Sequence, residues 1–153
     1  MGEAYDAFED ARPVVERLLE LSQAGSDLDP VRDAEPLQAL TEEATALFSE
    51  DVELVTRDGT LHGPQRVVSD WEVQTRDFRL RFEGLRFLDA GDGTVVAVYR
   101  LMRSAREGDD YMTSWSAIVC RVRDGRIVFF EGYLDGSQAL RDLGLDPALA
   151  RQP

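Results

Sequence analysis

Residues 113–135 read TSWSAIVCRVRDGRIVFFEGYLD, and this stretch decides the fold. Two apolar runs of strand length flank Asp124-Gly125, a dipeptide that favours the tight turn of a β-hairpin. Residues 113–123 and 126–135 are therefore predicted to form two long antiparallel strands. Every other side chain along such a strand points to the same face of the sheet, so the pairing of these two strands decides which residues meet.

The chain before this hairpin divides into a helical part and a strand part. Apolar residues recur at helical spacing over 12–21 and 37–48, and again after Gly63-Pro64. A small hairpin over 52–62 stands between the second and third predicted helices. Two more strands are predicted over 78–87 and 94–102, the first with a bulge where the apolar alternation changes parity at Gly84. Three helices followed by four long antiparallel strands predict the α+β class, with the helices on one face of a curved sheet.

Asp124-Gly125 can close a turn of two residues, or a turn of three residues that includes a glycine bulge. The three-residue turn places Ile118 opposite Phe130 and Ser116 opposite Gly132, and it separates the charged side chains from the apolar ones better. We expect this register. One face is then uncharged: Ser114, Ser116, Ile118, Cys120, Val128, Phe130, Gly132 and Leu134. The opposite face carries Trp115, Val119, Phe129 and Tyr133, which are too apolar for solvent and predict a homodimer through that face.

Composition excludes several classes of function. The chain has 153 residues, enough for one domain, and its net charge is −13. The sequence has no lysine and 17 arginines, and no arginine stripe offsets the acidic field, so we expect no nucleic-acid partner. No apolar run is long enough to span a membrane, and the N-terminal residues contain no apolar signal segment, so a cytoplasmic protein is expected. With one cysteine, neither an internal disulfide nor a metal site is expected.

Three short motifs carry a resemblance to a known family. They are LFSEDVEL at 47–54, LHG at 61–63 before a helix, and RDGRI at 123–127, which leads into Tyr133-Leu134-Asp135. With these motifs the chain resembles the nuclear-transport-factor-2-like (NTF2-like) superfamily, and within it the SnoaL-like group. The resemblance implies a cone-shaped fold, an apolar pocket between the sheet and the helices, and a homodimer through the convex sheet face. We therefore expect an acidic lead-in over 1–12, a single domain over 13–145 and a tail over 146–153.

The resemblance also indicates which positions hold acid-base groups in related enzymes. Ketosteroid isomerases carry a general base, a protonated aspartate and a tyrosine at positions matched here by Thr56, Ile118 and Leu18. Relatives of limonene-epoxide hydrolase carry an aspartate at the position of Gly132. Polyketide cyclases of the SnoaL type keep acid-base residues on the last two strands, where the acids here are Glu131 and, at the end, Asp135. Most of the matched positions therefore carry no acidic residue, which favours a protein that binds a ligand without catalysing a reaction.

Three polar residues remain as catalytic candidates. His62 is the sole histidine and precedes Gly63-Pro64 at the expected mouth of the pocket. Tyr99 and Arg100 interrupt an apolar strand, so one should face inward, and an inward Tyr99 could donate a hydrogen bond to a ligand carbonyl. Glu131 is the third candidate, although the expected register points it away from the pocket. The expected pocket residues are Thr56, Trp71, Ser116, Ile118, Cys120, Phe130, Gly132 and Leu134.

Two hypotheses about function follow. The first is a cofactor-free isomerase, cyclase, dehydratase or hydrolase that acts on a small hydrophobic molecule, polyketide-like or steroid-like, as the resemblance implies. The second is a non-catalytic ligand-binding or dimerisation module of the same fold. Neither hypothesis calls for a cofactor or a metal.

Overall fold

The computed structural model describes residues 7–106 and 110–151, and of Arg76 the backbone alone. It confirms the predicted α+β class and the order of helices and strands. The elements are α1 (Ala7–Ser26), α2 (Ala34–Ala46), β1 (Phe48–Thr56), β2 (Gly59–His62), α3 (Pro64–Asp77), β3 (Phe78–Gly91), β4 (Thr94–Ala105), β5 (Met112–Arg123), β6 (Arg126–Tyr133), α4 (Gly136–Asp142) and the 3₁₀-helix η1 (Pro147–Arg151). Within these described residues, no helix is both long enough and apolar enough to cross a membrane.

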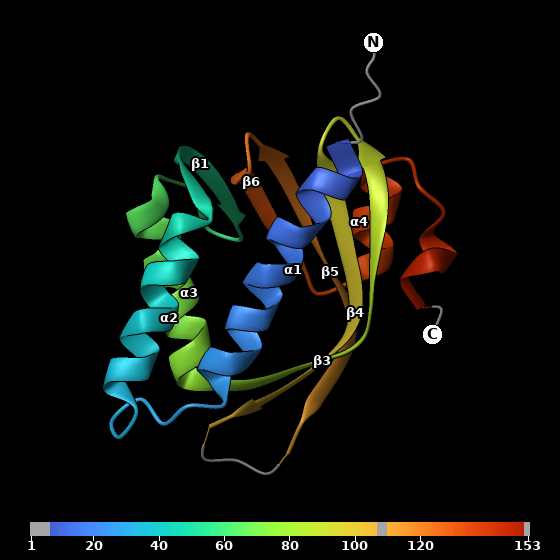
Figure 1. Cartoon of the computed structure of the whole chain (residues 1–153). Coiled ribbons are helices and arrows are strands. Elements are labelled where there is room, and N and C mark those ends of the chain that lie inside the picture. Colours follow the sequence, from blue (N-terminus) through green and yellow to red (C-terminus); the bar gives the residue numbers. More distant parts are fainter. Residues whose placement is uncertain (1–6, 107–109, 152–153) are drawn as a thin grey trace.

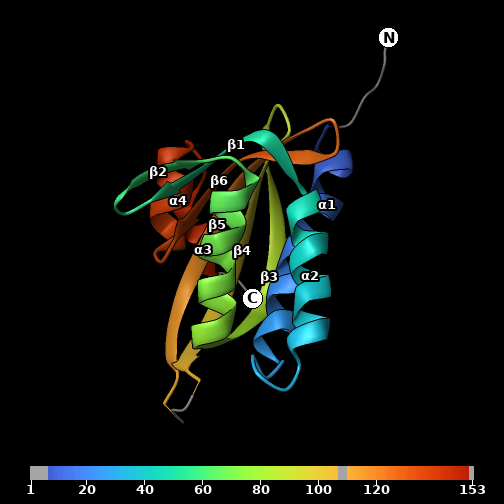
Figure 2. The same ribbon diagram turned by 90° about the vertical axis from the view of Figure 1, so that its left-hand side faces the viewer.

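The strands form one mainly antiparallel sheet in the order β2-β1-β6-β5-β4-β3. The exception is the pair of β1 and β6, the second and third strands of the sheet, which run parallel. The sheet curls around α1 (Figure 1), while α2 and α3 stand beside it at the open side of the curl (Figure 2). The predicted bulge in β3 is confirmed: the pairing with β4 shifts between Glu83 and Arg86, where Gly84 has a φ of 62°. Such a bulge bends its strand and increases the twist, which contributes to the curl.

The turn between β5 and β6 differs from the expected one. Asp124 and Gly125 have φ values of 53° and 77°, and Arg123 pairs with Arg126 across them. Positive φ at both central residues is typical of a two-residue type I′ turn. The predicted three-residue turn is therefore wrong. The two-residue turn is favoured because its twist matches that of the flanking strands.

The extra residue lies in the strand instead of the turn. The register of the β5–β6 pair shifts by one residue just after the turn, and beyond the shift Ile118 pairs with Gly132 and Cys120 with Phe130. The expected pairs, Ile118 with Phe130 and Ser116 with Gly132, are therefore wrong by two residues. Because two residues is a full strand period, the predicted division into two faces survives the error.

Two apolar clusters cover the two faces of the sheet. The inner cluster joins α1 and α3 to the side of the sheet that carries Ile118 and Phe130. The outer cluster packs Ala139 and Leu140 of α4, with part of η1, against Val119 and Phe129. Val119 is 5% exposed as a result. The face predicted to form the dimer is therefore covered in part by the chain's own C-terminal segment.

The expected domain limits shift at both ends. Helix α1 begins at Ala7, so residues 7–12, expected in the lead-in, are helical and place Ala11 in the inner cluster. Near the C-terminus, residues 147–151 form η1 and bury Ala150, where a tail was expected. Both segments are ordered because they bury apolar residues, Ala11 and Ala150, against the rest of the protein. Residues 1–6 and 152–153 lie outside the described residues.

Candidate functional site

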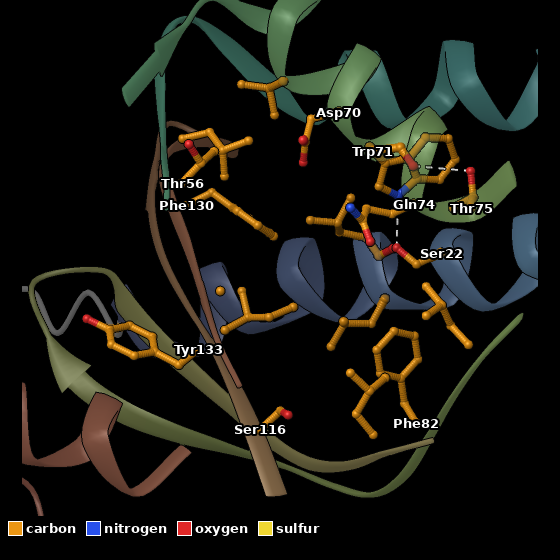
Figure 3. A pocket seen from close by; sticks show the side chains of 18 of the residues that line it. Ser22, Thr56, Asp70, Trp71, Gln74, Thr75, Phe82, Ser116, Phe130 and Tyr133 are labelled. Carbon is orange, nitrogen blue, oxygen red and sulfur yellow. Dashed lines mark hydrogen bonds between the residues drawn. The ribbon is translucent and has the colours of Figure 1, made fainter. Parts of the chain in front are cut away.

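A cavity of about 360 Å³ lies between the inner face of the sheet and the helices α1 and α3 (Figure 3). Its volume falls within the range of small-molecule sites, roughly 300 to 1,000 Å³. Most of the wall is apolar, with contributions from five strands (β1 and β3 to β6) and both helices. Representative wall residues are Leu18, Leu54, Val67, Leu101, Ile118 and Phe130. The cavity therefore suits a ligand with a hydrophobic body.

The predicted pocket residues lie where the sequence places them, with one exception. Thr56, Trp71, Ser116, Ile118, Phe130, Gly132 and Leu134 all line the cavity. Cys120 is fully buried beneath the wall, and burial raises the pKa of its thiol well above the usual value. A thiol in that setting stays protonated and packs as a small hydrophobic group.

The positions that the family resemblance connects with acid-base chemistry also meet at this cavity. Leu18, Thr56, Ile118 and Gly132 all line it. The Thr56 hydroxyl donates a hydrogen bond of 2.7 Å to the Gly59 carbonyl, so it stabilises the β1–β2 turn. These four positions therefore shape the pocket and supply no acid to it.

Tyr99 faces the cavity and Arg100 faces away from it. Tyr99 is 5% exposed, and its ring meets the Phe82 ring edge-on with centroids 5.0 Å apart. Arg100 is exposed and pairs with Glu83 at 3.9 Å. Within the described part of the chain, the Tyr99 hydroxyl has no hydrogen-bond partner. Burial raises the pKa of Tyr99, so the hydroxyl stays protonated and can donate a hydrogen bond.

The other two catalytic candidates do not reach the cavity. His62 is exposed at the end of β2, opposite Glu53, and is not among the lining residues. It misses the pocket because β2 is the edge strand, whereas α3 and the end of β1 form that wall. Glu131 pairs with Val119 on the outer face. Burial raises the pKa of the neighbouring Tyr133 to about 12, and the charge of Glu131 adds to this shift.

Asp70 is a pocket residue that the sequence reading missed. It lies on α3, half-buried, and its carboxylate points into the cavity (Figure 3). Among the described residues it has neither a hydrogen bond nor an ion pair. Burial raises the pKa of Asp70 above the usual value for aspartate. The signal was present in the spacing: Asp70 and Gln74 follow Val67 by three and seven residues, which places both on the apolar face of the helix.

Most other polar groups in the wall already have partners. The Trp71 indole N–H donates to the Ser22 hydroxyl at 2.9 Å, and that hydroxyl donates to the Leu18 carbonyl. The Ser116 hydroxyl donates to the Leu134 carbonyl at 3.1 Å. A polar group that is satisfied within the protein has less to offer a ligand. Asp70, Gln74, Tyr99 and Arg103 stand out in the wall, because no described group is hydrogen-bonded to their side chains.

Comparisons with known proteins give the fold its context. No protein-family model matches the sequence, and no curated protein matches it either. Solved structures do match. A candidate polyketide cyclase from Xanthomonas campestris pv. campestris superposes with a TM-score of 0.65 at 15% identity, over 90% of this chain and 99% of that one.

Two further structures agree with the first. An NTF2-like protein of unknown function from Cytophaga hutchinsonii gives a TM-score of 0.56 at 13% identity, over 87% of this chain and 93% of that one. An epoxide hydrolase from M. tuberculosis, similar to limonene-epoxide hydrolase, gives 0.62 at 15% identity, over 84% of each chain. At such identities the similarity shows a shared fold only. Any function must therefore be argued from the residues of the pocket.

Proposed function

We propose that this chain, which has the NTF2-like fold, is a cofactor-free enzyme that moves a proton on a small hydrophobic carbonyl compound. One observation carries the proposal: the partly buried Asp70 carboxylate has no partner among the described residues and points into an apolar cavity that Tyr99 also lines. Isomerisation, cyclisation, dehydration and hydrolysis all use proton transfer of this kind. Structural neighbours described as a candidate cyclase and an epoxide hydrolase support the proposal at the level of reaction class.

The chemistry follows from the two groups. A carboxylate that burial has made more basic can remove a proton from the carbon beside a carbonyl group. The electron pair of that C–H bond then moves onto the carbonyl oxygen, where the Tyr99 hydroxyl stabilises the resulting enolate by donating a hydrogen bond. Protonated Asp70 returns the proton to another carbon of the same molecule. The product is an isomer, and no electron or atom is left over.

The wild-type protein is expected to convert cyclohex-3-enone, or a bicyclic ketone of the same type, to the conjugated isomer. The ultraviolet absorbance of the product gives the rate. Tyr99→Phe should lower kcat by about 10²- to 10³-fold, the usual loss when one donor to an oxyanion is removed. Binding of these ketones with no turnover by the wild type would favour the alternative, a non-catalytic binding module. That alternative draws support from the lack of acids at Leu18, Thr56, Ile118 and Gly132.

We also propose a cytoplasmic homodimer, with its interface on the part of the outer face that α4 and η1 leave open. Trp115 and Phe129 are half-buried there, which leaves large apolar groups partly in contact with solvent. Trp115→Glu is expected to shift sedimentation from dimer to monomer, because it places a charge in the interface. Val31→Glu, at a residue that is 85% exposed in the α1–α2 loop, serves as the control. A dimer that persists in Trp115→Glu would contradict this interface.

A further inference from the structure

The pocket also holds a cation, Arg103 of β4. Arg103 follows Tyr99 and Leu101 at intervals of two residues, and all three line the cavity. Its guanidinium lies over the ring of Phe78, with Cζ 4.7 Å from the ring centroid. The contact with the ring uses the charge of the guanidinium and none of its N–H donors, which remain open to a ligand.

Among the described residues, several exposed arginines, such as Arg79 and Arg81, also have no partner, but of the partly buried arginines Arg103 alone has neither a hydrogen bond nor an ion pair. Arg100, its neighbour on the outer face, pairs with Glu83, and Arg106 donates to the carbonyls of Leu28 and Thr75. Arg103 has no hydrogen bond or ion pair with any described group, although acidic residues outnumber basic ones by 30 to 17. A half-buried guanidinium with unused donors needs an acceptor to offset its loss of water.

Asp70 does not supply that acceptor. No ion pair joins it to Arg103, and the raised pKa of Asp70 has burial as its only cause, with no lowering by a nearby cation. The cavity therefore has an anion-binding group and a separate carboxylate, with apolar wall around them. A ligand that satisfies both Arg103 and the apolar wall must be apolar in its body and anionic at one point.

We infer that the ligand of this pocket is an amphipathic monocarboxylate, with its carboxylate on Arg103 and its hydrophobic body against the apolar wall. The fork of an arginine matches the two oxygens of a carboxylate. The net charge of −13 disfavours a more highly charged headgroup such as a phosphate monoester. The inference rests on the proposed function only in taking this pocket as the ligand site; it does not depend on catalysis.

Calorimetric titration with octanoate, 1-octanol and octyl phosphate tests the inference. The wild type should bind octanoate more tightly than 1-octanol or octyl phosphate. Arg103→Gln should weaken octanoate binding about 10- to 100-fold, since hydrogen bonds to charged groups contribute more than neutral ones. Its affinity for 1-octanol should stay the same, which also shows that the variant is folded. Arg103→Lys keeps the charge without the fork and should fall in between.

Arg100→Gln is the matched control, because Arg100 lies on the same strand and faces the other way. It should leave octanoate binding unchanged. Equal wild-type affinity for octanoate and 1-octanol would overturn the inference, and so would an equal loss of both ligands in Arg103→Gln or tighter binding of octyl phosphate. A different result would show that only the proposed catalytic function is wrong: octanoate would bind through Arg103, but the protein would not turn over any ketone.

Discussion

Asp70→Asn is expected to lower turnover of the unsaturated ketones by about 10²- to 10⁴-fold, the usual contribution of a positioned acid-base group. Asparagine keeps the size of the side chain but cannot accept the proton. Glu72→Gln, an exposed carboxylate on the same helix, is the control and should leave the rate unchanged. The absorbance assay under saturating ketone measures both variants. Wild-type rates in Asp70→Asn would remove Asp70 from the mechanism.

The pH dependence of rate and stability checks the same residue. Burial raises the pKa of Asp70 in the folded protein, so the rate should rise with pH through a pKa above the usual aspartate range. The native state also holds this proton more tightly than the unfolded chain does. The stability that protonation contributes is therefore present at low pH and is lost as pH rises through the folded pKa. At pH 7, Asp70→Asn should melt at or above the wild-type temperature, so a large drop would indicate a structural role.

Gly132→Phe is expected to abolish ligand binding while the fold persists. A Cβ built at Gly132 meets nothing within 4 Å, and the residue lines the cavity opposite Ile118. A phenyl ring placed there occupies space that the ligand needs. If the ring displaces about five methylene groups, at about 0.8 kcal/mol each, the affinity falls about 10³-fold. Titration with 1-octanol measures the loss, since this probe needs no charge on the protein.

Gly132→Ala is the control for this substitution. Its methyl group enters open space and should leave 1-octanol binding within a few-fold of the wild type. Circular dichroism with thermal unfolding should show that both variants keep their fold. Undiminished binding by a folded Gly132→Phe protein would mean that the ligand occupies a different part of the molecule.

Local patterns in the sequence predicted most of the fold. The alternation around Ile118 and Phe130 identified the inner face even though the register was two residues off, because strand periodicity tolerates an even error. The parallel pairing of β1 with β6 was not predicted, since it joins segments that no local pattern connects. The packing of α4 on Val119 was missed for the same reason.

The candidate site was harder to predict than the fold. Strand parity placed Ser116 in the wall and predicted that either Tyr99 or Arg100 faces inward, and the structure shows that Tyr99 does. Asp70 was missed because the family resemblance drew attention to strand positions, whereas the acid comes from a helix. His62 was favoured as the sole histidine and for its place before Gly63-Pro64 at the expected mouth of the pocket, and its location on the edge strand became visible only once the order of strands was known.

The parallel pair of β1 and β6 sets the order in which the protein can be completed on the ribosome. Synthesis runs at about 5 to 20 residues per second, so β1 waits several seconds for the strand that becomes its neighbour. Until then β1 and β2 can form only an isolated hairpin, which is marginal in water. A nascent chain that ends before Arg126 therefore has no closed cavity and leaves an edge of β5 open to pair with another chain.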